Sequence, residues 1–159
     1  MNTRALTLLL AATILFSACG AKLIPNLDIQ LTDTPDHRAL LVIMAKYRQA
    51  YEAKDIDTLV SLTSERFYED LGTPETKDDY NYKGLKSHFS KHFKQVNDLQ
   101  LNITLKDVRV DGDKARMDYH YVTRYLIKLP SGERWQVTDE LNRMELVKEG
   151  ADWKVISGF

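Results

Sequence analysis

The fold is decided by the stretch from Leu99 to Lys128, which reads LQLNITLKDVRVDGDKARMDYHYVTRYLIK. Apolar or aromatic residues alternate with polar ones along both halves, which is typical of strands with one buried face. The halves meet at Asp111-Gly112-Asp113, a tight hairpin signal. The apolar residues change parity just before this turn, which predicts a bulge near Asp107. The stretch therefore predicts two long antiparallel strands in a sheet that the bulge bends.

The second strand of this pair has two different faces. Its odd-numbered residues form the face that we expect to be buried. They are Ala115, Met117, Tyr119, Tyr121, Thr123, Tyr125 and Ile127. A third strand is expected after the turn Pro130-Ser131-Gly132, with Trp135, Val137 and Leu141 pointing inward. Met144 and Leu146 have the opposite parity, which predicts a second bulge, and Glu149-Gly150 predicts a last turn.

The chain before these strands has helical periodicity. Thr34-Pro35-Asp36 is a helix start, with Thr34 as the N-cap. Asp55 is expected to cap a second, shorter helix, and a third helix is expected to follow Gly84, after a loop at residues 75–82. Helices followed by consecutive antiparallel strands predict an α+β fold. N-terminal helices packed on a strongly bent sheet would form a cone with an internal pocket.

The first eighteen residues have the three parts of an export signal. Arg4 supplies a positive start, Ala5–Phe16 is an uncharged apolar run, and two small residues precede Cys19. The run is too short to span a bilayer, which needs about 20 apolar residues. Residues 15–19 (LFSAC) resemble the lipobox of bacterial lipoproteins, with Phe16 where Leu is usual. This resemblance implies lipidation of Cys19, with palmitate or similar acyl chains in the membrane.

Cleavage before Cys19 would divide the chain into three parts. We expect a signal peptide at residues 1–18, a lipidated tether at residues 19–33 and one folded domain at residues 34–159. Without Arg4 the mature chain has 21 basic and 23 acidic residues, a net charge of −2, so nucleic acid is not an expected partner. The expected location is the cell envelope. The resemblance to lipoproteins implies the periplasmic side of the outer membrane in a Gram-negative cell, because Gly20 rather than Asp follows the cysteine.

In the order of its motifs the chain resembles the nuclear transport factor 2-like superfamily. The likeness lies in residues 47–57 (YRQAYEAKDID), 84–89 (GLKSHF) and 145–156 (ELVKEGADWKVI). These motifs span nearly the whole predicted domain. The superfamily includes enzymes, transport factors, ligand binders and assembly domains, so the fold alone does not choose a function.

Two candidate catalytic residues follow from this resemblance. In the ketosteroid isomerase branch, the position of Tyr47 stabilises an oxyanion, and the position of Asp70 supplies a base. Asn142 stands where that branch has a protonated acid. We therefore interpret Tyr47 as a core residue and Asp70 as a loop carboxylate, with catalysis as the alternative.

The candidate pocket residues are polar aromatic side chains on the expected inner faces, with one histidine and one acid. They are Tyr47, Tyr51, His92, Tyr119, Tyr121, Tyr125, Trp135 and Asp139. They fit an aromatic-walled pocket for an apolar or sugar-like ligand, or an ordinary core. His88 and His92 share one side of a helix, but no third metal ligand is near in sequence, so neither a metal nor a cofactor is expected.

Three functions remain open. The favoured hypothesis is a membrane-tethered, non-catalytic domain that binds a small ligand or a protein partner in the envelope. The second is an isomerase- or cyclase-like enzyme that uses the same pocket. The third, implied by the superfamily resemblance, is an assembly module that forms a homodimer through the outer face of its sheet.

Overall fold

The computed structural model describes residues 22–24, 27–72, 74, 76–129 and 131–159. The predicted signal peptide at residues 1–18 and the predicted lipidation site, Cys19, lie outside the described residues. Within the described part of the chain, no helix is long and apolar enough to cross a membrane.

In the part of the chain that the structure describes, three helices precede the main sheet: α1 (Pro35–Ala53), α2 (Ile56–Ser61) and α3 (Tyr82–Lys94). Both predicted N-caps are confirmed, because Thr34 accepts a hydrogen bond from the His37 amide and Asp55 accepts one from the Thr58 amide. Helix α3 begins before Gly84, since Asn81 caps it by accepting from the amides of residues 83 and 84. The predicted loop at 75–82 is therefore shorter than expected.

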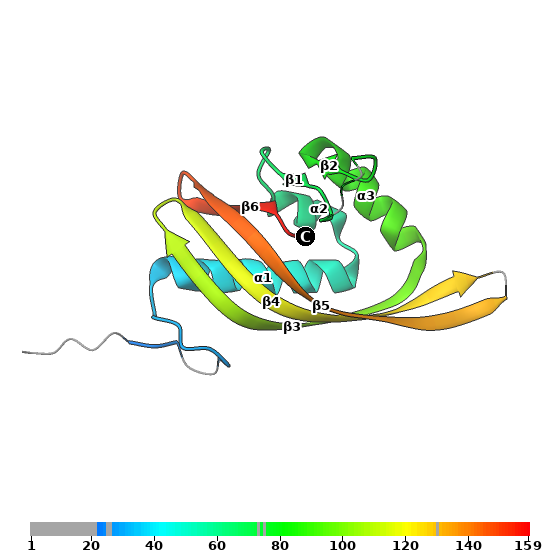
Figure 1. Cartoon of the computed structure of the whole chain (residues 1–159), viewed down its shortest axis with the longest axis horizontal. Coiled ribbons are helices and arrows are strands. Elements are labelled where there is room, and N and C mark those ends of the chain that lie inside the picture. The colour runs from blue at the N-terminus through cyan, green and yellow to red at the C-terminus, as the bar shows by residue number, and fades with distance from the viewer. Residues whose placement is uncertain (1–21, 25–26, 73, 75, 130) are drawn as a thin grey trace, which may run out of the picture.

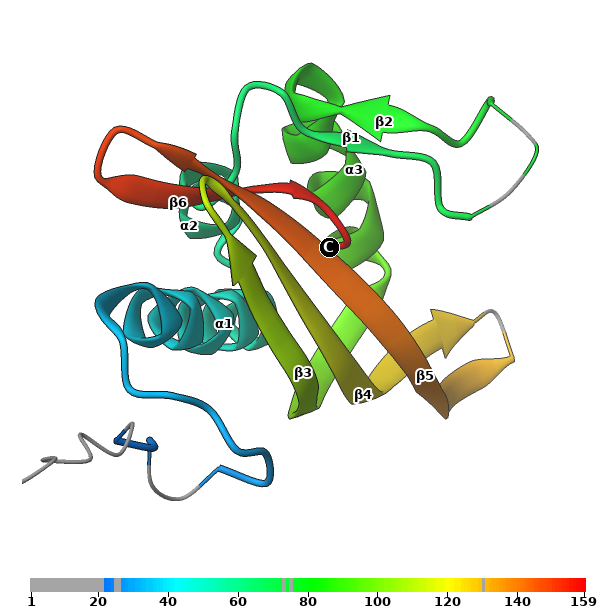
Figure 2. The same cartoon turned by 60° about the vertical axis from the view of Figure 1, so that its left-hand side comes forward.

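The main sheet has four antiparallel strands in the order β3-β4-β5-β6. They are β3 (Val96–Asp111), β4 (Lys114–Leu129), β5 (Gly132–Glu149) and β6 (Asp152–Ser157). A small second sheet pairs β1 (Tyr68–Glu69) with β2 (Tyr80–Asn81). The main sheet is strongly bent, and all three helices lie on its concave side (Figures 1 and 2). This arrangement is the predicted α+β fold.

The strand register confirms the first predicted bulge and the buried face of β4. The pairing of β3 with β4 shifts between Leu105 and Asp107. On β4, Met117 and Tyr119 are almost fully buried and Thr123 is buried, whereas none of the even-numbered residues from Lys114 to Leu126 is. The period-two pattern therefore assigned the faces of β4 correctly.

The second predicted bulge is misplaced, and this reverses the expected direction of half of β5. The pairing of β4 with β5 runs without a shift, and the irregularity lies instead between Glu145 and Leu146 in the pairing with β6. Trp135, Val137 and Leu141 therefore point to the outer face, where 50%, 56% and 74% of their surface is exposed. The expectation that they continue inward is wrong, because an uninterrupted register keeps every odd residue of β5 on one face.

Part of the predicted tether packs against the domain. Leu31 is buried, Leu27 and Ile29 pack against the core, and a bridge joins Leu23 to Thr32. The segment from residue 27 to residue 33 thus lies on the folded domain near α1 and β3. This shortens the stretch that remains available as a tether.

The core lies between the helices and the concave face of the sheet. Helix α1 packs on β3, and α2 packs on both α1 and α3. The start of α1 is tied to the sheet through Asp36, which accepts hydrogen bonds from Lys148 at 2.7 Å and from the Trp153 indole at 2.9 Å. These contacts fix the first turn of α1 to the hairpin end of β5 and β6.

Candidate functional site

Six of the eight predicted pocket residues lie on the concave side of the sheet, at two depths. Tyr47 of α1 and Tyr119 of β4 are buried and form the inner layer. The other four are half-buried and form what we call the aromatic rim: Tyr51 of α1, His92 of α3, and Tyr121 and Tyr125 of β4. Three elements that are distant in sequence thus bring the predicted residues together.

Hydrogen bonds and ring contacts connect the aromatic rim. The Tyr51 hydroxyl lies 3.1 Å from His92 Nε2, and the His92 ring centroid lies 6.4 Å from that of Tyr125. Tyr121 donates to Glu140 at 3.0 Å. Burial lowers the pKa of His92, so its imidazole is neutral at pH 7. Burial, together with neighbouring groups, raises the pKa of both Tyr51 and Tyr121 to about 12, so these hydroxyls stay protonated.

The inner layer is closed by the last residues of the sequence. The Phe159 ring stacks on Tyr47 with centroids 5.0 Å apart. Tyr119 donates to the Gly158 carbonyl at 3.0 Å and accepts from the Asn142 amide at 3.1 Å. Burial raises the pKa of both Tyr47 and Tyr119, which leaves two neutral phenols inside the domain. Such groups can hydrogen-bond a ligand, but they do not act as bases at neutral pH.

Tyr47 and Asp70 are not assembled into one catalytic pair. Asp70 is exposed in the loop after β1, where it accepts a hydrogen bond from the Gly72 amide at 2.9 Å. It lines a cavity of about 460 Å³ together with Asn142 and Gly158, and Tyr47 does not line this cavity. Phe159 covers the Tyr47 ring, and the adjacent Gly158 faces the cavity. The interpretation of Tyr47 as core and Asp70 as a loop carboxylate agrees with this geometry.

Trp135 and Asp139 are not part of the concave site. The register pairs Asp139 with Val122 and Trp135 with Leu126, on the face opposite to Tyr121 and Tyr125. Asp139 lies 2.6 Å from His120 Nε2 on this outer face. The prediction that both residues line the pocket is therefore wrong. The register of β5 turns them to the outer face together with Val137 and Leu141.

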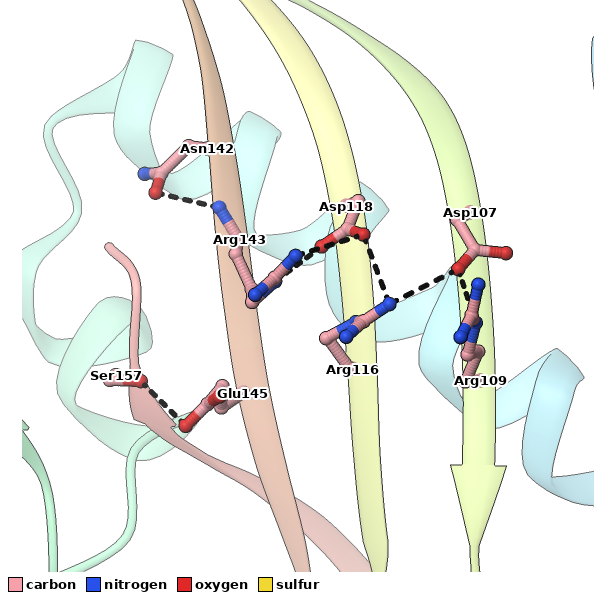
Figure 3. Close-up of polar contacts among 8 residues, drawn as sticks. All are labelled: Asp107, Arg109, Arg116, Asp118, Asn142, Arg143, Glu145 and Ser157. Atoms are coloured by element: carbon pink, nitrogen blue, oxygen red, sulfur yellow. Dashed lines mark hydrogen bonds and ion pairs between the residues drawn. The ribbon is translucent and has the colours of Figure 1, made fainter.

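A ladder of charged side chains crosses the outer face (Figure 3). Arg116 lies between Asp107 and Asp118, at 3.5 and 3.4 Å, and Arg143 donates to Asp118 at 2.7 Å. Arg109 donates to Asp107 at 2.6 Å. The hydrogen bond from Arg143 is the main reason why the pKa of Asp118 is lowered. Because these charges are paired across three strands, we interpret the ladder as structural.

The two helix histidines do not form a metal site with a third ligand. Within the described residues there is no group of three side chains of the metal-binding types. His92 is engaged by Tyr51, and His88 stacks on Tyr80 with centroids 3.9 Å apart. Both histidines are half-buried.

Two residues of the site escaped the sequence analysis. Phe159 shares the odd parity of Trp153 and Val155, and that continuation of the strand pattern was a usable signal. Glu140 was missed because we expected the odd-numbered residues of this part of β5, and not the even-numbered ones, on the concave face. Both follow from a correct register of the last two strands.

Comparisons with known proteins identify the fold. No family model matches the chain, and no curated protein matches its sequence. Solved structures that it resembles include a ketosteroid isomerase-like protein from Erwinia carotovora atroseptica, with a TM-score of 0.64, 13% identity, and coverage of 79% of this chain and 95% of that one. Others are the hexachlorocyclohexane dehydrochlorinase LinA (TM-score 0.65, 12% identity, 77% and 80% covered) and the protein Kfla4162 from Kribbella flavida (TM-score 0.67, 15% identity, 77% and 87% covered). The chain therefore has the nuclear transport factor 2-like fold.

Proposed function

We propose that the chain is a membrane-tethered, non-catalytic lipoprotein domain of the cell envelope that binds a small ligand on the concave face of its sheet. One observation carries the proposal. The aromatic rim combines half-buried rings with neutral hydrogen-bonding groups, whereas Tyr47 and Asp70, the pair that catalysis would need, do not line the same cavity. Concave sites with aromatic walls and a few polar groups are typical of small-molecule binding.

The chemistry of the rim favours a ligand with a flat apolar surface and hydroxyl groups. Rings of Tyr125 and Tyr121 offer faces for stacking, as sugar rings and aromatic rings require. Neutral His92 and Tyr51 offer a donor and an acceptor in either tautomer. The lipid predicted on Cys19 would hold this surface near the envelope, where such fragments of lipids and glycans are concentrated.

Ligand-observed NMR with the full chain, purified as it accumulates in the cell, tests the binding. The probes are p-hydroxybenzoate, phenol, glucose and N-acetylglucosamine. We expect saturation transfer to at least one probe, and its loss in Tyr125→Ala. Trp135→Ala is the matched control, because Trp135 is an exposed aromatic residue on the opposite face of the sheet. Equal signals in both variants, or none with the whole panel, would refute the proposed site.

The enzyme hypothesis is the second candidate, because structural neighbours include the dehydrochlorinase and the ketosteroid isomerase-like protein named above. Turnover of a simple enolisable ketone distinguishes it. We expect no turnover above the buffer rate in the wild type. Enzyme-level turnover that disappears in Asp70→Asn would replace the binding-only proposal with an isomerase.

One feature of the outer face supports the assembly hypothesis. Trp135, Val137 and Leu141 expose an apolar strip there, next to a ladder that carries both signs of charge. A second copy of the chain would meet such a self-complementary face, as in an isologous dimer. Sedimentation of the wild type and of Leu141→Lys distinguishes this case, since only a dimer through this strip would dissociate in the variant.

A further inference from the structure

The segment Gly158–Phe159 is held in the interior of the domain in the manner of a bound ligand. The last residue, marked C in Figures 1 and 2, lies between the sheet and the helices. The Phe159 ring stacks on Tyr47 at 5.0 Å and lies 5.6 Å from Phe67 and 6.0 Å from Phe89. Its aromatic surroundings thus come from α1, from α3 and from the segment before β1.

The backbone of Gly158 has two polar partners in addition. Its amide donates to Glu69 Oε2 at 2.6 Å, and its carbonyl accepts from the Tyr119 hydroxyl at 3.0 Å. One donor, one acceptor and one ring are therefore each matched by a side chain. The remaining hydrogen bond of this group, from Asn142 to the Tyr119 hydroxyl, orients that hydroxyl toward the carbonyl.

Only glycine fits at position 158. Its φ is +84°, and a Cβ atom there would lie 1.8 Å from the Arg143 carbonyl oxygen and 2.9 Å from the Met144 Cα. The segment therefore enters the interior only because its backbone passes directly against β5. A side chain at this position would force the segment out of its place.

The segment lies beyond the paired part of β6 and borders a cavity. The last residue of β6 paired in the sheet is Ser157, opposite Glu145. The cavity of about 460 Å³ beside Asp70 is lined by Gly158 as well as by Glu69 and Asn142. A small molecule in that cavity would lie next to the groups that hold the Gly158 backbone.

From this geometry we propose that Gly158–Phe159 is a displaceable plug, and that the site beneath it binds a small N-acylglycine amide that carries a phenyl group. The phenyl ring of such a ligand takes the place of the Phe159 ring on Tyr47. Its glycyl carbonyl accepts from Tyr119, and its glycyl N–H donates to Glu69, as those of Gly158 do. The inference deepens the proposed function, on which it rests, by extending the concave site inward and by naming a ligand class. It also makes the plug a competitor, so the apparent affinity is reduced by the fraction of time that the plug is in place.

The test measures binding of N-acetylglycine phenethylamide, which carries the ring, the glycyl carbonyl and the glycyl N–H, to the full chain by calorimetry. N-acetylglycine methylamide, which lacks the ring, is the control ligand. Phe159→Ala removes the competing ring, and Gly158→Ala expels the segment by its clash with Arg143. Gly150→Ala is the matched control, because Gly150 also has a positive φ, of +63°, but a Cβ atom there meets nothing within 4 Å.

We expect Phe159→Ala and Gly158→Ala to bind N-acetylglycine phenethylamide at least about tenfold more tightly than the wild type, which corresponds to a plug that is open no more than about a tenth of the time. Gly150→Ala should bind like the wild type, and N-acetylglycine methylamide should bind to none of them. Folded Phe159→Ala or Gly158→Ala protein that gains no affinity overturns the proposal. If neither variant folds, NMR of the wild type tests the proposal: contacts between the Phe159 and Tyr47 rings must weaken as N-acetylglycine phenethylamide is added, and unchanged contacts overturn the proposal.

The outcomes separate this inference from the proposed function. Probe binding that is lost in Tyr125→Ala, with no gain in either plug variant, refutes the plug alone. A gain in the plug variants that is accompanied by no probe binding at the aromatic rim refutes the rim as the site and leaves the interior site standing. No binding of any probe to any variant refutes both.

Discussion

The change Tyr119→Phe tests how firmly the interior is held by a single hydroxyl group. Tyr119 is 1% exposed, and its hydroxyl makes one hydrogen bond to the buried Gly158 carbonyl and one to the half-buried Asn142. Removing the hydroxyl leaves the Gly158 carbonyl without this partner, which costs about 1–3 kcal/mol for a buried group. Asn142 lines the neighbouring cavity and can bond to water there, so it adds little.

We therefore expect Tyr119→Phe to lower the free energy of unfolding by about 1–3 kcal/mol. For a chain of this size the loss corresponds to a fall in Tm of roughly 3–9 °C. The measurement is urea and thermal unfolding of the full chain, followed by circular dichroism. Tyr121→Phe is the matched control, because its hydroxyl bonds to the exposed Glu140 and its removal should change stability by about 0.5 kcal/mol or less. Equal stability of the two variants would refute the role assigned to the Tyr119 hydroxyl.

Three further predictions concern the anchor, the rim and the faces of the sheet. Cys19→Ala should abolish both labelling with palmitate and partitioning into detergent, and a wild-type chain that shows neither would contradict the lipid anchor. Burial lowers the pKa of His92, so the folded state takes up fewer protons than the unfolded state. The free energy of unfolding should therefore fall as the pH falls below about 6.5. This fall should be less steep in His92→Gln. A Tm that varies equally with pH in the two proteins would exclude this effect. Met117→Ala, at a fully buried position of β4, should cost about 2–5 kcal/mol in urea unfolding. Leu141→Ser on the outer face should change stability by about 0.5 kcal/mol or less, and a similar loss in both would show that the faces are wrongly assigned.

The features that were predictable from the sequence are those with a local physical cause. Thr34 and Asp55 cap their helices because a side-chain oxygen reaches an amide three residues later, whatever the rest of the chain does. The bulge near Asp107 follows from a change of parity within one strand. The alternation on β4 likewise assigned Tyr119, Tyr121 and Tyr125 to the concave face, because neighbouring side chains on a strand must point to opposite sides.

The candidate site was predictable only in part, because much of it depends on contacts between residues that are distant in sequence. Tyr47 and Tyr51 were found from helical spacing, and His92 from its place within an apolar helix face. That these residues meet Tyr121 and Tyr125 depends on how α1 and α3 lie over the sheet. That Tyr47 and Asp70 line no common cavity is equally non-local, because Phe159, from the far end of the sequence, covers the Tyr47 ring.

By itself, the sequence determined the α+β class, the starts of α1 and α2, the hairpins and the buried face of β4, since each rests on contacts between residues close in the chain. Only the tertiary structure decided the direction of Trp135 and Asp139. Apolar residues on a strand usually lie on the face that packs against the core. The helices do not cover the outer face of β5, however, so the apolar residues there are exposed and the sequence pattern predicted the wrong face. The structure also decided what fills the cone. A glycine with a positive φ at position 158 lets the backbone pass against β5 and delivers a phenyl ring to Tyr47, and no local pattern specifies where such a segment comes to rest.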